Sequence, residues 1–327
     1  MASVAPESSA AAESVGLALG QVEVEGKSPR QLFWDRFKRD KVALASLVFL
    51  TLLVLVAIFA GVIAKHVVHH GPNDLYQSET LDEFGLPTGP SKDFWFGVDA
   101  SGRDVFIRVI YGARTSLIVA VVATGFAVFV GTVLGLIAGY FGRFTDTVIS
   151  RTIDIILAVP YLLFAIGIVA ACGTSKEGCL GGLIEPGRTL VIFVIAIFSW
   201  PYIARIIRGN TLSIREKEFV EASRSLGASD FRIMFREVLP NLVAPIIIYS
   251  TLLIPSNILF EAALSFLGLG VPPSTPSWGQ MLSDAAQIFD IAWWLMLFPG
   301  LFLVATTLAF NLLGDGLRDA LDPRAAR

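Results

Sequence analysis

Charged residues are scarce in this sequence. Asp, Glu, Lys and Arg make up 16% of the 327 residues, whereas hydrophobic residues make up 54%. Soluble proteins carry roughly 25% charged residues, and a chain of this length needs them to cover a folded exterior. The shortage excludes an ordinary soluble protein and indicates that much of the surface faces lipid. We predict an all-α polytopic membrane protein.

Several features that carry chemistry are also missing. Two cysteines are too few for a disulfide scaffold or a four-cysteine zinc site, and a net charge of −3 argues against nucleic-acid binding. The sequence holds no Gly-x-x-x-x-Gly-Lys-Ser/Thr phosphate loop, so we do not expect it to hydrolyse ATP in that manner. No nucleophile pairing or His/Asp/Glu cluster stands in the predicted cytoplasmic segments. We therefore predict no catalytic residue, no metal site and no cofactor in this chain.

Uncharged runs give the membrane spans. A helix needs about 20 apolar residues to cross the hydrocarbon core. Six runs are close to that length and give spans at about residues 42–64, 117–141, 155–171, 189–206, 242–262 and 291–313, the fourth and fifth spans extending two residues beyond the uncharged runs 189–204 and 242–260. The third and fourth are short, and each contains a proline, Pro160 and Pro201, which membrane helices tolerate. We predict six transmembrane helices.

The positive charges predict the orientation. With the N-terminus in the cytoplasm, 18 of the 25 Lys and Arg residues lie inside, as the positive-inside rule requires. Both termini are then cytoplasmic, 65–115 is an extracytoplasmic loop and 207–240 is a cytoplasmic loop. We expect a multi-pass protein of the bacterial plasma (inner) membrane.

The N-terminal segment divides into two parts. Residues 1–27 have no long apolar core and no basic start, so they indicate a disordered cytoplasmic tail rather than a signal peptide. Residues 28–41 interleave aromatic and basic side chains, which predicts an amphipathic helix on the inner membrane surface. Anchoring charge without a helix is the alternative. The permease domain would then occupy 42–327.

Two features of the predicted outer loops leave alternatives open. Cys172 and Cys179 flank a short outer loop, where a disulfide can persist; a buried thiol at Cys172 is the alternative. His66, His69 and His70 suggest metal or haem binding, but no Cys, or Glu at helical spacing, completes a coordination shell. We interpret the histidines as part of a hydrated linker.

The predicted cytoplasmic loop contains a helical hairpin. A first helix can run to Leu226, where Gly227 is free to adopt the left-handed conformation that ends it. Ser229 or Asp230 can then cap a second helix, which Pro240 stops or bends. Apolar residues recur on that second helix at i, i+3, i+4 and i+7: Phe231, Met234, Phe235 and Val238.

This loop resembles the EAA loop of bacterial ABC importer permeases. The matching residues are Glu221, Ala222, Ser223, Gly227, Glu237, Val238, Leu239 and Pro240. The sequence departs from the family pattern at Ser223, where Ala is usual, and at Glu237, where many members have Ile. The resemblance implies that Glu221, Ala222, Ser223, Gly227, Leu239 and Pro240 couple the chain to an ATP-hydrolysing subunit.

Further segments resemble the dipeptide, oligopeptide and nickel permease group, and most of all its DppC/OppC-like subunit. They are residues 96–105 (FGVDASGRDV), 112–117 (GARTSL), 138–142 (AGYFG) with Asp146, Arg151 and Asp154, 261–273 (EAALSFLGLGVPP), 277–279 (SWG), 313–315 (LGD) and 321–323 (LDP). The resemblance covers residues 28–325 and leaves out the N-terminal tail.

The resemblance implies the type I ABC importer (MetI-like) fold and a non-catalytic role in transport. Such a chain forms half of a pathway for di- or oligopeptides, or alternatively for nickel, another metal chelate or haem. The implied partners are a second, DppB/OppB-like permease, two DppD/DppF-like ATPase subunits that bind ATP and magnesium, and an extracytoplasmic substrate-binding protein. An ion channel or secondary transporter acting alone is the alternative class; a coupled carrier would need intramembrane charged relays, and the predicted spans contain none.

Four residues are candidates for movement in transport. Pro245, Pro255 and Pro299 interrupt predicted spans and can act as hinges or as static kinks. Glu261 ends the fifth span, where a carboxylate marks a gate or a scaffold contact, or simply reaches headgroup water. We expect the fifth span to transmit movement from the hairpin to the pathway.

Overall fold

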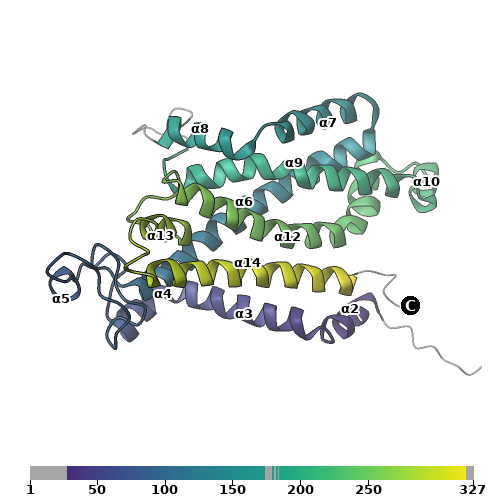
Figure 1. Cartoon of the computed structure of the whole chain (residues 1–327). Helices are drawn as coiled ribbons and strands as arrows, with labels where there is room; N and C mark the ends of the chain where they lie inside the picture. The colour runs from purple at the N-terminus through teal and green to yellow at the C-terminus, as the bar shows by residue number, and fades with distance from the viewer. Residues whose placement is uncertain (1–27, 174–178, 180–181, 183, 322–327) are drawn as a thin grey trace, which may run out of the picture.

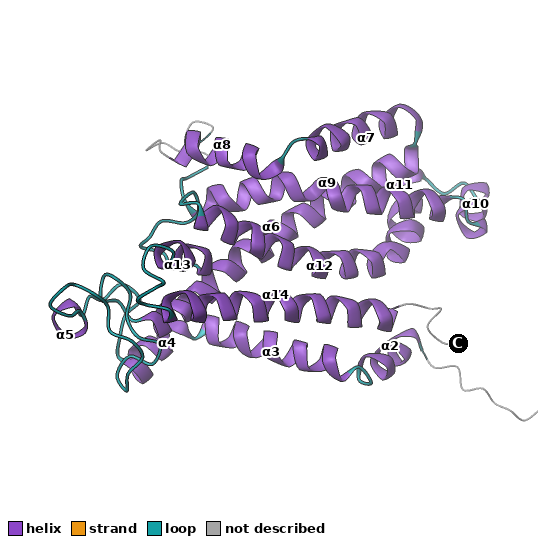
Figure 2. Ribbon diagram, in the orientation of Figure 1, coloured by secondary structure: helices purple, strands orange, loops and turns teal. Residues whose placement is uncertain are grey.

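The computed structural model describes residues 28–173, 179, 182 and 184–321, and helices dominate this part of the chain (Figure 2). The predicted tail, 1–27, lies outside the described residues. The α-helices are α2 (Pro29–Phe37), α3 (Lys41–Ile58), α4 (Ala60–Ile63), α5 (Gln77–Thr80), α6 (Val105–Phe141), α7 (Arg143–Ala158), α8 (Tyr161–Gly173), α9 (Arg188–Arg215), α10 (Glu218–Ser225), α11 (Asp230–Arg232), α12 (Leu239–Phe266), α13 (Trp278–Ala285) and α14 (Trp294–Leu321). Two short π-helical segments, η1 (Ala64–Val68) and η2 (Ile233–Val238), complete the helical elements of this part.

The membrane spans follow from length and composition. Within the described residues, α3, α6, α9, the continuous helix 230–266 and α14 are each long and apolar enough to cross a membrane. Helices α7 and α8 pass the same test together, although they are bent by 82° at the break between them. Counted as one broken span, this pair gives the six spans expected from the sequence.

Three helices extend beyond the bounds predicted for their spans, which remain predictions. Helix α6 begins at Val105 rather than near residue 117, because Asp104 caps its first turn by accepting from the Phe106 amide at 2.8 Å. The helical segment of the third predicted span begins at Arg143 and is broken between α7 and α8. Helix α9 continues to Arg215, about two turns beyond the predicted membrane exit at 206.

The break in the third span has a local cause. Val159 adopts an extended conformation after α7 ends, and Pro160 precedes the start of α8 at Tyr161. Proline disfavours a helical conformation in the preceding residue and has no amide hydrogen to donate. Pro160 was therefore visible in the sequence, and the structure shows that it marks a change of direction between α7 and α8.

Close packing of α6 on α9 forms the centre of the molecule. Gly131, Gly135 and Gly139 recur every four residues on α6, and a Cβ at Gly135 would lie 2.6 Å from the Ala204 carbonyl oxygen of α9. Small residues at this spacing let two membrane helices approach closely. The two helices run parallel, since positions further along α6 meet positions further along α9.

The other helices surround this pair. Figure 1 shows α14 between α12 and α3, with α7 and α8 on the opposite side of α9. Helices α2 and α10 lie at one end of the bundle, together with the end of α14, whereas α5 and α13 lie at the other (Figure 1). The first and last described residues are therefore at the same end as α10. Helix α2 begins with a capping box between Ser28 and Gln31, and Phe37 is buried in the core.

The loop before α6 is held by polar contacts rather than being a loose linker. His70 Nδ1 and Asp104 Oδ2 lie 2.7 Å apart, and the His70 ring stacks on Phe94. Arg103 Nε donates to Asp99 Oδ2 at 2.7 Å. His66 and His69 do not join His70 in a ligand set, and no cluster of three metal-ligating side chains occurs among the described residues.

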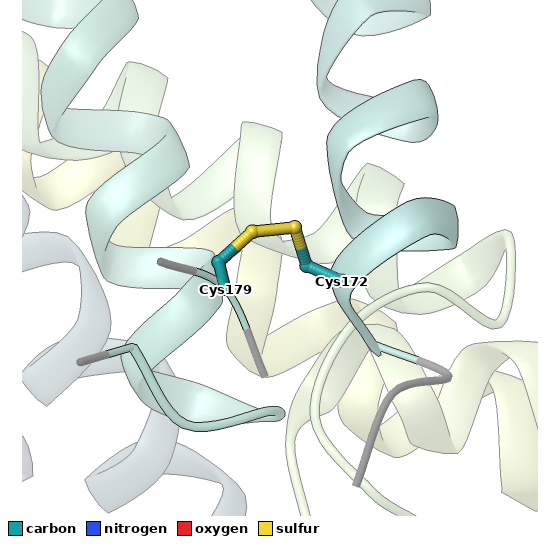
Figure 3. Close-up of a disulfide and its surroundings, with 2 residues drawn as sticks. All are labelled: Cys172 and Cys179. Atoms are coloured by element: carbon teal, nitrogen blue, oxygen red, sulfur yellow. A yellow bond between two sulfur atoms is a disulfide. The ribbon is translucent and has the colours of Figure 1, made fainter. Parts of the chain in front are cut away.

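Cys172 and Cys179 are joined by a disulfide (Figure 3). Cys172 lies in the last turn of α8, and its Cα is 5.1 Å from that of Cys179. The alternative of a buried free thiol therefore does not apply to this structure.

Candidate coupling site

The end of α9 places the predicted hairpin at one end of the bundle. Arg215 Nη1 donates to the carbonyl oxygens of Gly139 and Tyr140 at 3.0 and 3.3 Å. These carbonyls belong to the last turn of α6, which lacks intrahelical donors and favours a cation. The position of α10 is thereby tied to the tightly packed α6–α9 pair, and Val220 of α10 is fully buried.

The turn of the hairpin has the predicted conformation. Gly227 has φ of +80°, which glycine adopts without the strain that a side chain would cause. Its amide donates to the Arg224 carbonyl, and the Ala228 amide donates to that of Ser223 at 3.1 Å. These two bonds form a Schellman cap, which satisfies the last carbonyls of α10.

The second half of the hairpin differs from the sequence expectation. The N-cap residue, Ser229, makes no capping bond with its side chain. Asp230 instead accepts a hydrogen bond from the hydroxyl of Tyr140 on α6, at 2.7 Å. That contact joins residues 90 positions apart, so helical spacing could not reveal it.

The buried face of this second helix is also shifted. Of the four apolar residues at helical spacing, Met234 and Val238 are buried, whereas Phe231 and Phe235 are 67% and 45% exposed, and Ile233 is buried as well. Residues 233–238 form a π-helical turn, which contains more residues per turn than an α-helix and changes which side chains face inward. The periodicity of 3.6 residues was the wrong assumption here.

Pro240 does not stop the second helix, which was one of the two outcomes expected from the sequence. It is the second residue of α12, which directly follows the π-helical turn 233–238. Residues 230–266 therefore form one continuous helix. A movement of the hairpin can pass directly along this helix into the bundle.

The predicted coupling residues lie on and around this hairpin. Glu221, Ala222 and Gly227 are exposed, Ser223 and Leu239 are half-buried, and Pro240 is exposed. Four large apolar side chains are exposed on the same segment, namely Phe219, Leu226, Phe231 and Phe235. Leu226 is 89% exposed. Apolar side chains gathered among charged ones mark a surface suited to a second protein.

The residues proposed for movement lie within continuous helices. Pro245 and Pro255 are inside α12, and Pro299 is inside α14. Glu261 does not reach headgroup water: its side chain is fully buried and accepts hydrogen bonds from Ser116 and Ser265 at 2.8 and 2.7 Å. Glu261 therefore joins α12 to α6 inside the bundle.

Charged pairs occur within the membrane helices, where the sequence had predicted none. Arg208 of α9 donates to both carboxylate oxygens of Asp146 on α7, and Arg205 Nη2 donates to Asp154 Oδ1 at 2.6 Å. The predicted third span began at 155, so both aspartates lay outside it. Asp146 and Asp154 are eight residues apart, which places them on one face of an amphipathic helix, and this spacing could have indicated a charged face.

These features define a class of protein. Up to six spans in the described part of the chain, with a helix–turn–helix segment exposed at one end of the bundle, indicate a polytopic membrane protein that offers a surface to another protein.

Comparisons with known proteins identify the family. Residues 131–327 match the family described as binding-protein-dependent transport system inner membrane component, and residues 28–80 match the N-terminal TM domain of oligopeptide transport permease C. The chain belongs to this family of ABC importer permeases and is a multi-pass inner-membrane protein. A channel or secondary transporter acting alone is thereby set aside. Permeases of this family work with ATPase subunits and binding proteins.

Curated relatives match over nearly the whole chain. The dipeptide transport system permease protein DppC of Alkalihalophilus pseudofirmus is 42% identical, over 91% of this chain and 90% of its own. The glutathione transport system permease protein GsiD is 44% identical in Escherichia coli and 40% identical in Pectobacterium atrosepticum, with coverage of 91% or more of each chain. Both names describe permease subunits, which are transport components.

A solved structure supports the predicted fold. The chain is similar to a chain of the MetNI methionine ABC transporter in an inward-facing conformation, with a TM-score of 0.53 and 19% sequence identity. The match covers 66% of this chain and 96% of that one. The MetI-like, type I importer fold is therefore confirmed.

Proposed function

We propose that this chain is a permease subunit of an ATP-driven importer for short peptides, including dipeptides and glutathione. It lines half of the pathway, beside a second permease. Two ATPase subunits, which bind ATP and magnesium, supply the energy, and an extracytoplasmic binding protein delivers the peptide. The ends of the chain and the α10–α11 hairpin lie in the cytoplasm.

One observation carries this proposal. The hairpin of α10, α11 and η2 exposes four large apolar side chains, and hydrogen bonds of Asp230 and of Arg215, at the end of α9, fix its position relative to α6. A movement of a partner bound there would be transmitted into the bundle, since residues 230–266 form one helix without a break. The nature of the peptide is supported by relatives that match 90% or more of their own length.

Reconstitution tests the proposal directly. The chain is co-expressed with its second permease and ATPases, placed in proteoliposomes and supplied with the binding protein. We expect labelled Ala-Phe or glutathione to accumulate only with hydrolysable ATP and the binding protein. Uptake that needs neither ATP nor partner subunits would contradict the proposal. ATP-dependent uptake of a nickel chelate or haem, with neither peptide taken up, would contradict the assignment of substrate.

A paired variant tests the docking surface. Leu226→Asp places a charge at the most exposed apolar residue of the hairpin, whereas Phe84→Asp changes an apolar residue of similar exposure in the loop before α6. Only the first is expected to prevent co-purification of the ATPase subunits.

A further inference from the structure

A line of charged side chains crosses the broken third span, and the coupling site does not use it. Asp154 on α7 and Arg205 on α9 make a single hydrogen bond of 2.6 Å, with side chains 54% and 55% exposed. Asp146 and Arg208 form a two-bond pair on the same helices, with side chains 20% and 30% exposed. The Asp154–Arg205 pair is therefore more exposed and held by fewer hydrogen bonds than the Asp146–Arg208 pair.

Both pairs line one cavity between α7 and α9. Its volume is about 380 Å³, and its remaining lining residues are Thr147, Ser150, Arg151 and Ile153. Sites for small molecules have volumes of about 300–1,000 Å³ and place a few polar groups to orient the ligand. The cavity thus offers both signs of charge in a volume suited to a short peptide.

The cavity lies along α9 rather than at the end of that helix. Arg205 is ten residues before the end of α9 at Arg215, about 15 Å along the helix axis. A half-exposed charge at such a position faces water or another protein rather than lipid. The break between α7 and α8 lies near the middle of the bundle's length (Figure 1), and discontinuous helices form substrate sites near the membrane centre in secondary transporters, a different class.

A second cavity lies beside the break between α7 and α8. Leu157 and Tyr202 line it; Leu157 lies one turn after Asp154 on α7, and Tyr202 lies one turn before Arg205 on α9. Its volume is about 190 Å³, and Tyr161 and Asn257 also border it. Polar and aromatic groups therefore follow the charged cavity toward the opposite end of the bundle.

We propose that Asp154 and Arg205 form a transit site for the two charged ends of a peptide. The Asp154 carboxylate binds the peptide ammonium group, and the Arg205 guanidinium binds its carboxylate, for which a guanidinium fork is well suited. Exposed ion pairs are weak and open readily, so the peptide replaces the bond between Asp154 and Arg205. The Asp146–Arg208 pair keeps α7 on α9. This inference rests on the proposed function, and it adds the residues that the peptide contacts.

The amount of peptide taken up per ATP hydrolysed tests the proposed contacts of Asp154 and Arg205 with the peptide. In the reconstituted complex, Asp154→Asn and Arg205→Gln are each expected to lower uptake of the peptide that the wild type accumulates by at least fivefold. ATPase stimulation by the loaded binding protein should stay within twofold of wild type. Asp319→Asn, which changes an exposed carboxylate at the end of α14, is the matched control and should match wild type in both measurements.

The double variant separates substrate binding from a structural lock. If the pair only held two helices together, neutralising both partners would restore uptake, because the loss comes from leaving one partner unpaired. If each residue binds its own end of the peptide, Asp154→Asn/Arg205→Gln transports no better than either single variant. Restored uptake, or loss of ATPase stimulation together with uptake, would overturn the proposal.

Thiol labelling tests whether water reaches the cavity, independently of the peptide. Ser150→Cys lines the cavity, whereas Val148→Cys is exposed on another side of α7. In the complete complex, a membrane-impermeant charged reagent should modify Ser150→Cys at least tenfold faster. Equal rates, or protection of Ser150→Cys by the second permease, would overturn the proposal. A wild-type complex that takes up no peptide would instead contradict the proposed function.

Discussion

The hydroxyl of Tyr140, in the last turn of α6, donates a hydrogen bond of 2.7 Å to the carboxylate of Asp230, the first residue of α11. The bond joins the packed centre of the bundle to the hairpin that we propose as the ATPase docking site. Arg215 reinforces the same place by donating to the carbonyls of Gly139 and Tyr140. The hairpin is therefore held from both sides of its turn.

Tyr140→Phe should weaken coupling without preventing assembly. A hydrogen bond to a charged group contributes about 1.5–3 kcal/mol, so its loss changes the population of the docked hairpin by about tenfold or more. We expect peptide taken up per ATP to fall several-fold while the ATPase subunits still co-purify. Tyr111→Phe, near the other end of the same helix, is the control. Wild-type uptake by Tyr140→Phe would show that the bond has no role in coupling.

Gly227→Pro should abolish stimulation of ATP hydrolysis by the loaded binding protein. Proline fixes φ near −65°, whereas Gly227 has φ of +80°, so the turn cannot form. Gly227→Ala keeps the turn at a cost of about 1 kcal/mol and should reduce stimulation only partly. Membrane insertion should be normal in both. Gly209→Ala, at a helical glycine with open space around it, should behave as wild type, and normal stimulation in Gly227→Pro would refute the hairpin mechanism.

Local signals in the sequence predicted much of this arrangement. Uncharged runs identified the spans because the bilayer selects by composition, and Gly227 identified the turn because few other residues adopt its conformation. Contacts between distant residues were not predictable: Tyr140 with Asp230, or Glu261 with Ser116. The π-helical turn at 233–238 was also not predicted, because the spacing of the apolar residues was interpreted with an α-helical period.

Glu261 offers a test of one of those hidden contacts. Glu261→Ala leaves the hydroxyls of Ser116 and Ser265 without their acceptor, at about 1–3 kcal/mol for each buried group, and also opens a cavity. Glu261→Gln retains the shape and one acceptor oxygen. We expect the thermal midpoint in detergent to fall clearly for alanine and less for glutamine. Glu83→Ala, in an exposed loop, should not change it; equal midpoints for all three would contradict this role.

Gly135 tests the packing at the centre of the bundle. A side chain there would meet the Ala204 carbonyl oxygen at 2.6 Å and Ile207 at 3.0 Å, so Gly135→Leu should force α6 and α9 apart. Overpacking costs about 1–3 kcal/mol, occasionally more. Gly125→Leu, on the same helix but with nothing within 4 Å, is the matched control. The yield of monodisperse protein should fall only for Gly135→Leu.

The disulfide between Cys172 and Cys179 can establish the orientation of the chain. Disulfides persist on the oxidising, extracytoplasmic side of a bacterial membrane, so we expect this pair to be oxidised in cells. After reduction, a membrane-impermeant maleimide added to intact spheroplasts should label both thiols. Cys172→Ser/Cys179→Ser is the control, and it should lower the stability of the chain by about 2–3 kcal/mol, since the closed loop is short. Labelling that requires permeabilised cells would reverse the proposed orientation, and it would place the α10–α11 hairpin, at the other end of the bundle, on the side without ATP.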